Sequence, residues 1–73
     1  MAISVVLIHV SRYLEIEVLI KLSKLHEITY LNSLFGKYNL MAKIEAKDYE
    51  RIGDIIVNKI KTIDWVTDIK TLT

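Results

Sequence analysis

The stretch that decides the fold is Ile-Ser-Val-Val-Leu-Ile-His-Val, residues 3–10. Its β-branched and apolar residues fall on both alternating faces: Ile3, Val5 and Leu7 on one, Val6, Ile8 and Val10 on the other. A strand of this kind is covered on both sides, because neither face suits water. The apolar stretch is too short to cross a membrane and has no basic start or cleavage site. It therefore predicts a buried strand and no membrane anchor.

The pattern of apolar residues outward from this strand predicts five more elements. They are a helix from Ser11 or Arg12 to near His26, strands over residues 28–35 and 38–46, a helix beginning after Asp48, and a strand over residues 65–73. Ser11 and Asp48 are the expected N-caps of the two helices. Gly36-Lys37 suits a two-residue type II′ turn between the middle strands. The apolar stripe expected on the second helix consists of Ile52, Ile56, Ile60 and Ile63.

The order strand, helix, strand, strand, helix, strand predicts an α+β, ferredoxin-like two-layer sandwich. Both helices are expected on one face of a four-stranded antiparallel sheet, with residues 1–73 forming one domain. No further helices remain to cover the other face of the sheet, although the strand at 3–10 is apolar there. We therefore expect this open face to pack on a second copy in a two-fold dimer.

Composition excludes several classes of function. The chain has 73 residues, and its hydrophobic fraction of 52% is high for so small a protein, which favours an oligomer. Ten Lys and Arg against nine Asp and Glu leave a net charge of +1, too little for direct binding to nucleic acid. With no cysteine and two histidines, disulfides are excluded and a metal site is disfavoured. The expected compartment is the cytoplasm.

Catalytic candidates are few. His9 lies near the end of the first strand, without an orienting carboxylate or a nucleophile at a diagnostic spacing. His26 lies at a helix end, where a cation complements the helix dipole. The sequence therefore favours a non-enzymatic protein. The alternative is a small dimeric α+β enzyme, a cofactor-free oxygenase or isomerase with one histidine as the base in a pocket between sheet and helices.

A known family is similar to the middle of the chain. The segment Leu-Phe-Gly-Lys-Tyr-Asn-Leu-Met-Ala-Lys-Ile-Glu-Ala-Lys-Asp, residues 34–48, resembles the ligand-binding (RAM) domain of the Lrp/AsnC feast/famine transcription regulators. That family has Thr-Gly-x-Tyr-Asp there, followed by an apolar strand that ends in an acidic residue. His-Glu-Ile at 26–28 stands where the family often has Pro-Glu-Val, and residues 60–67 stand where it has a helix end, Pro-Gly-Val-Thr and the last strand.

Three positions depart from the family pattern. They are Asn39 in place of Asp, Asp64-Trp65 in place of Pro-Gly, and Ile69-Lys70 within a Thr-x-Thr pattern that leaves Thr71. These departures bear on which effector is bound.

The resemblance implies a stand-alone RAM module without the N-terminal DNA-binding domain of the family. Such modules are sheet-face homodimers that assemble into octameric or decameric rings, with a free amino acid held between subunits near the hairpin loop. Full-length Lrp/AsnC regulators would be partners; no cofactor, membrane or direct contact with nucleic acid is implied. The ligand-binding residues then expected are Gly36, Lys37, Tyr38, Asn39 and Thr71. In this scheme Gly36 admits a ligand close to the backbone, Tyr38 forms a rigid wall, and Asn39 is a neutral donor and acceptor.

Overall fold

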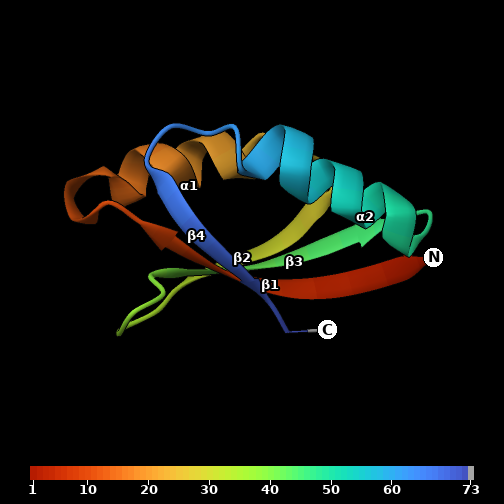
Figure 1. The fold of residues 1–73 in the computed structure, drawn as a ribbon, viewed down its shortest axis with the longest axis horizontal. Helices are drawn as coiled ribbons and strands as arrows, with labels where there is room; N and C mark the ends of the chain where they lie inside the picture. The colour runs from red at the N-terminus through yellow and green to blue at the C-terminus, as the bar shows by residue number, and fades with distance from the viewer. Residues whose placement is uncertain (73) are drawn as a thin grey trace.

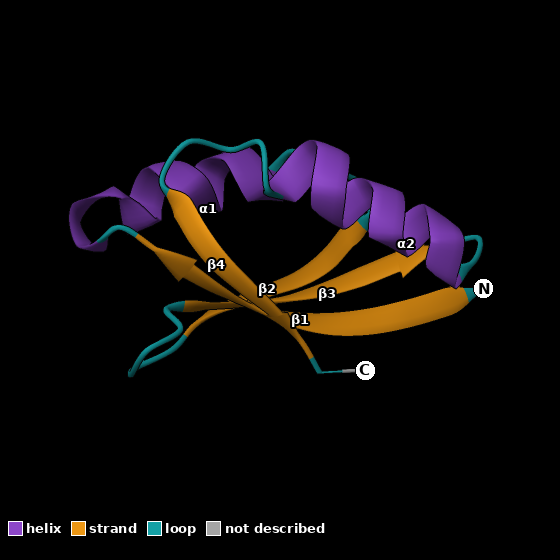
Figure 2. Cartoon of the chain, in the orientation of Figure 1, coloured by secondary structure: helices purple, strands orange, loops and turns teal. Residues whose placement is uncertain are grey.

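The computed structural model describes residues 1–72 and has the predicted order of elements (Figure 1). The elements are β1 (Ala2–Val10), the 3₁₀ turn η1 (Arg12–Leu14), α1 (Glu15–Ser23), β2 (Ile28–Ser33), β3 (Leu40–Ala46), α2 (Tyr49–Ile55), the π turn η2 (Ile56–Ile60) and β4 (Val66–Thr71). The strands form one antiparallel sheet, and both helices lie on the same face of it (Figure 2). The predicted ferredoxin-like α+β sandwich is confirmed.

Strand β1 lies in the middle of the sheet, whose order is β2-β3-β1-β4. Ile8 pairs with Leu40 of β3 on one side and with Ile69 of β4 on the other, so its side chain points into the core together with two apolar neighbours. The fully buried core lies between sheet and helices, and its larger members are Val6, Ile8, Val10, Val18, Leu22, Leu40, Ile44, Ile55 and Ile60. The alternate residues of β1 face the open side of the sheet, where Ile3 is 43% exposed.

The first helix differs from its prediction at both ends. Ser11 makes no side-chain capping bond; instead, its carbonyl oxygen accepts from the Leu14 N–H at 2.9 Å, which closes the 3₁₀ turn η1. The Ser11 N–H donates to the carbonyl of Trp65 at 3.0 Å, and this bond ties the turn to the start of β4. Helix α1 ends at Ser23, before His26, because successive three-residue turns lead the chain directly into β2.

The second helix begins as predicted and then changes its pitch. The Asp48 carboxylate accepts from the Arg51 N–H at 2.8 Å, so the predicted N-cap is confirmed. At η2 the Lys61 N–H donates to the carbonyl of Ile56, five residues earlier, at 2.8 Å. This wider turn rotates the stripe, so that Ile55 is buried and Ile56 is only half-buried. The buried positions of the second helical segment are therefore Ile52, Ile55 and Ile60.

The hairpin between β2 and β3 is wider than the sequence predicts. The prediction of a two-residue type II′ turn is wrong, because β2 ends at Ser33, β3 begins at Leu40, and residues 34–39 form a loop. The Leu34 N–H closes this loop by donating to the carbonyl of Asn39 at 2.7 Å. The Asn39 N–H pairs with β1 instead, donating to the carbonyl of Ile8 at 3.0 Å. Figure 1 shows the loop extending from the sheet on the side away from the helices.

The last strand is shorter than predicted and follows a strained residue. Strand β4 covers Val66–Thr71, and Thr73 lies outside the described residues. Trp65, immediately before the strand, has φ +76°, a left-handed conformation that costs a residue with a side chain about 1–2 kcal/mol. Its indole ring lies 5.3 Å from the Lys21 ammonium, and this contact helps to hold the turn.

Candidate functional site

The loop at residues 34–39 carries four of the five predicted ligand-binding residues. Gly36 has φ +116°, a backbone conformation that residues other than glycine rarely adopt. Nothing lies within 4 Å of the place where its Cβ would be, so the backbone conformation, not crowding, requires glycine here. The Phe35 ring beside it is fully exposed. The loop therefore leaves the Gly36 backbone and the Phe35 ring accessible to a ligand.

Asn39 holds the base of this loop. Its Oδ1 accepts from the Val10 N–H at 2.6 Å, which joins the loop to the end of β1. Because that donor must face an oxygen, the orientation of the amide follows, and Nδ2 is left with two N–H donors. The sequence predicted Asn39 as both a donor and an acceptor toward a ligand; in the structure the acceptor is occupied within the fold.

Tyr38 crosses from the loop to the opposite edge of the sheet. Its hydroxyl donates to Oδ2 of Asp68 on β4 at 3.1 Å, and the other carboxylate oxygen, Oδ1, accepts from the Ile69 N–H at 3.0 Å. Partial burial and the neighbouring Asp68 carboxylate raise the pKa of Tyr38 above its ordinary value, so the phenol keeps its proton. The Lys37 ammonium lies 5.5 Å from the Tyr38 ring. The loop thus brings a cation, a phenol and a carboxylate together.

His9 and Thr67 extend this cluster along the sheet. The His9 Nδ1 contacts the Thr67 hydroxyl, which in turn donates to the carbonyl of His9 at 3.2 Å. With that hydroxyl proton directed to the carbonyl, the His9 Nδ1 is the donor of the pair. The side-chain partner of the His9 ring is the Thr67 hydroxyl and not the carboxylate of Asp68, its neighbour across the strands, so the orienting carboxylate of a general base is missing.

Thr71 lies apart from the loop within this chain. It pairs with Val6, three residues along β1 from His9, which corresponds to roughly 10 Å. The structure therefore brings together Gly36, Lys37, Tyr38 and Asn39 and leaves Thr71 outside. His9, Thr67 and Asp68 were missed as neighbours of the loop, because only the register between β1 and β4 puts them there.

Neither a metal site nor a membrane-spanning helix is found among the described residues. Among residues 1–72, no group of three or more His, Cys, Asp or Glu side chains is arranged to hold a metal ion. Within the same residues, each helix falls short of the length and apolar character that crossing a membrane requires.

The comparisons with known proteins agree with this geometry. The model of the Lrp/AsnC ligand binding domain matches residues 4–73. The crystal structure of FFRP-DM1 is similar, with a TM-score of 0.94, 24% sequence identity, and coverage of 99% of this chain and 96% of that one. Escherichia coli AsnC has a TM-score of 0.89 and 25% identity, and covers 96% of this chain. No curated protein matches the sequence.

A transcriptional regulator from Neisseria meningitidis, solved as a complex with L-Met, shares the fold at a TM-score of 0.84 and 10% identity over 94% of this chain. The chain spans 48% of E. coli AsnC and 46% of the Neisseria regulator, so it corresponds to about half of each. With a family match over nearly all of its length and an architecture in agreement, this chain belongs to the Lrp/AsnC ligand-binding domain family.

Proposed function

We propose that this chain is an oligomeric sensor of a free amino acid, bound at the loop of residues 34–39. It modulates transcription through full-length Lrp/AsnC regulators with which it assembles, and it does not bind DNA itself. The observation that carries the proposal is the family match over residues 4–73. The net charge of +1 supports the absence of direct DNA binding, since nucleic-acid binders concentrate positive charge.

The chemistry of the loop suits a zwitterion. The Nδ2 donors of Asn39 and the exposed Lys37 ammonium offer hydrogen bonds to a carboxylate. The Asp68 carboxylate, whose oxygens each accept one hydrogen bond, keeps further acceptor capacity for an ammonium group. Lys37 and Asp68 thus supply opposite charges near the same loop, as a free amino acid requires.

A second copy of the chain would cover the open face of the sheet, and a neighbouring copy would add Thr71 to the binding site. The open face of the sheet, defined by cross-strand register, carries Ile3, Val5, Leu7, Tyr30, Met41, Lys43, Glu45 and Lys70. Ile3 is 43% exposed and Tyr30 51% exposed on this face, so pairing two such sheets removes apolar surface from water. Thr71 pairs with Val6, roughly 10 Å along β1 from His9, so in this proposal Thr71 joins the site from a neighbouring copy. An effector held in this way stabilises the octamer or decamer that completes its site.

No specific observation favours the alternative that the chain is an enzyme. It needs one of the two histidines enclosed in a cavity as the base; a cavity of about 650 Å³ has His26 but not His9 in its lining, and the His26 side chain is 90% exposed.

The test combines calorimetric titration of the twenty amino acids with light scattering of the same samples. We expect a measurable heat of binding with at least one amino acid, and light scattering should show an oligomer at the same protein concentration. The Asn39→Ala variant should bind that amino acid more weakly. The matched surface control, Lys24→Met, should bind it as the parent protein does. The proposal fails when an intact oligomer gives no heat with any of the twenty, or when Asn39→Ala binds as the parent protein does.

A further inference from the structure

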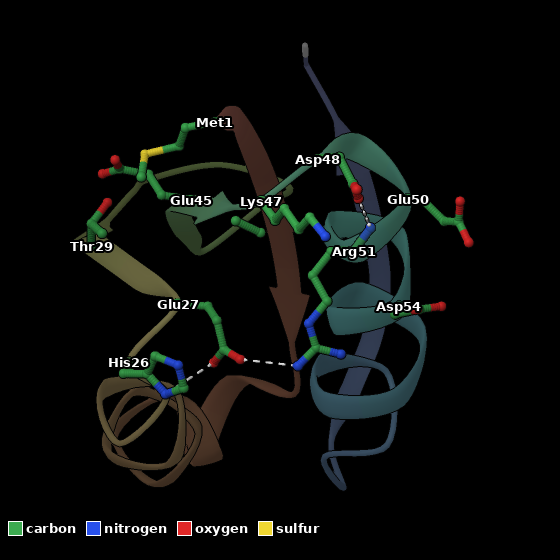
Figure 3. Close-up of a pocket in the computed structure, with 11 residues that line it drawn as sticks. Met1, His26, Glu27, Thr29, Glu45, Lys47, Asp48, Glu50, Arg51 and Asp54 are labelled. Carbon is green, nitrogen blue, oxygen red and sulfur yellow. Dashed lines mark hydrogen bonds and ion pairs between the residues drawn. The ribbon is translucent and has the colours of Figure 1, made fainter.

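A groove lies at the other end of β3 from the loop. It has a volume of about 650 Å³ and runs between the start of β2, the end of β3 and α2 (Figure 3). That volume falls within the ~300–1,000 Å³ of small-molecule sites. Strand β3 spans about 20 Å between the two places, so one small ligand cannot occupy both.

Glu27 lies in this groove with only 7% of its side chain exposed. Its Oε2 accepts from the Lys59 ammonium at 2.7 Å and faces the Arg51 guanidinium at 3.5 Å. The hydrogen bond from Lys59 lowers the pKa of Glu27, outweighing the opposing effect of burial. The carboxylate is therefore charged at neutral pH, and its Oε2 is fully engaged by two cations.

The second oxygen of this carboxylate is not satisfied. Oε1 of Glu27 is buried and accepts no hydrogen bond from another residue. The His26 Nδ1 lies 3.6 Å from Oε1, beyond hydrogen-bond distance. The His26 side chain is 90% exposed, so it can swing away at little cost in packing. A buried carboxylate oxygen without a donor costs free energy, which a donor on a ligand would recover.

The groove is lined by two basic side chains, Lys47 and Arg51, and by five acidic ones, Glu27, Glu45, Asp48, Glu50 and Asp54; of these, Glu45 pairs with Ile3 and lies on the open face of the sheet. Figure 3 shows Arg51 directed toward Glu27 and Lys47 running from the end of β3 toward α2, whereas Glu50 and Asp54 point away from Glu27. The Asp48 carboxylate already caps α2. Lys59 donates to Glu27 at 2.7 Å and one Arg51 nitrogen faces the same oxygen at 3.5 Å, so the Lys47 ammonium and the remaining N–H groups of Arg51 are left for an anion. The planar fork of Arg51 matches a carboxylate with two parallel hydrogen bonds.

We infer that this groove is a second binding site, for a small carboxylic acid that also carries a hydrogen-bond donor, the chemistry shared by α-amino and α-hydroxy acids. The carboxylate binds Arg51 and Lys47, and the amino or hydroxyl group replaces His26 as the neighbour of the Glu27 Oε1. Because it uses none of the residues of the loop at 34–39, this site stands whether or not the loop binds an effector.

The experiment uses three probes that differ in one group: L-alanine, L-lactate and propionate, which has the carboxylate but no donor. Each is titrated into the ¹⁵N-labelled chain, and amide shifts are followed at Glu27, Thr29 and Arg51 for the groove and at residues 36–39 for the loop. We expect groove shifts with alanine, lactate or both, and binding of propionate weaker by about tenfold, since a donor to a buried charged acceptor contributes about 1.5 kcal/mol. Binding of L-alanine or of L-lactate shows whether the amino group or the hydroxyl group donates the hydrogen bond to Glu27.

Variants separate this site from the loop. Arg51→Met keeps the aliphatic stem and is expected to weaken the groove response about tenfold, whereas Lys24→Met, at the exposed residue that follows α1, leaves it unchanged. Asn39→Ala is expected to leave the groove shifts as they are. The inference is overturned when no probe shifts the groove amides, when propionate binds as tightly as the other two, when Arg51→Met behaves as Lys24→Met does, or when Asn39→Ala abolishes the groove shifts.

Discussion

Replacing Lys59 by Met tests how the buried Glu27 carboxylate contributes to stability. Lys59 donates the shorter of the two hydrogen bonds to Glu27, at 2.7 Å, and the methionine keeps the apolar stem while it removes the charge. Breaking a fully buried pair costs about 3–5 kcal/mol, and an exposed pair contributes about 0–1 kcal/mol. The Glu27 side chain is 7% exposed and that of Lys59 35% exposed, and Arg51 stays nearby. We therefore expect a loss of about 2 kcal/mol at pH 7, between these limits.

The loss depends on pH in a defined direction. The pKa of Glu27 is lower in the folded protein than in the unfolded chain, so its contribution is complete above the unfolded value of about 4.3. That contribution disappears as the pH falls through the folded pKa, because the carboxylate is then protonated in both states. Lys59→Met should therefore destabilise the protein at pH 7 and much less at pH 3.

The assay is urea unfolding, or thermal melting, of the parent protein and the variant at both pH values. A loss of about 2 kcal/mol corresponds to a melting temperature lower by roughly 8–16 °C for a domain of this size. Lys61→Met, an exposed lysine near the same helix end, is the matched control and should change little. An equal loss at pH 3 and pH 7, or a loss in Lys61→Met as large as in Lys59→Met, would refute the assigned role of the Glu27 charge.

Three further predictions concern the fold. Trp65→Gly should be more stable than Trp65→Ala by about 1 kcal/mol in denaturant unfolding, because φ at this position is +76°; equal stabilities would show that the conformation carries no strain. Asp48→Ala removes the cap on the Arg51 N–H and should cost about 1 kcal/mol, and an unchanged unfolding midpoint would contradict the capping role. Leu7→Glu puts a charge in the middle of the open sheet face and should yield a monomer by sedimentation; persistence of the dimer would contradict the proposed sheet pairing.

Local patterns predicted the parts of the fold that depend on neighbours in sequence. The two apolar faces of β1 and the Asp48 cap follow from spacing over a few residues, and the structure agrees with both. The π turn that ends at Lys61 could not be predicted, because one additional residue in a turn leaves no mark on the apolar pattern. The width of the hairpin loop depends on Asn39 pairing with β1, a contact that its local sequence does not contain.

The sequence predicted only those residues of the site that are contiguous in the chain. Residues 36–39 were found because they are contiguous and resemble a family motif, whereas Asp68 reaches Tyr38 through strand pairing across thirty positions of the chain. The groove was missed altogether for the same reason, since Glu27 and Lys59 are separated by 32 positions. Only the folded structure brings such pairs together.

The central claim is that the loop at residues 34–39 binds a free amino acid where copies of the chain meet. A crystal structure grown with a mixture of the twenty amino acids tests it most directly. We predict an amino acid beside Gly36, its carboxylate near Asn39 Nδ2 and its ammonium near Asp68, with Thr71 supplied by a neighbouring copy. An assembled crystal form in which this loop is accessible and binds no amino acid would contradict the claim.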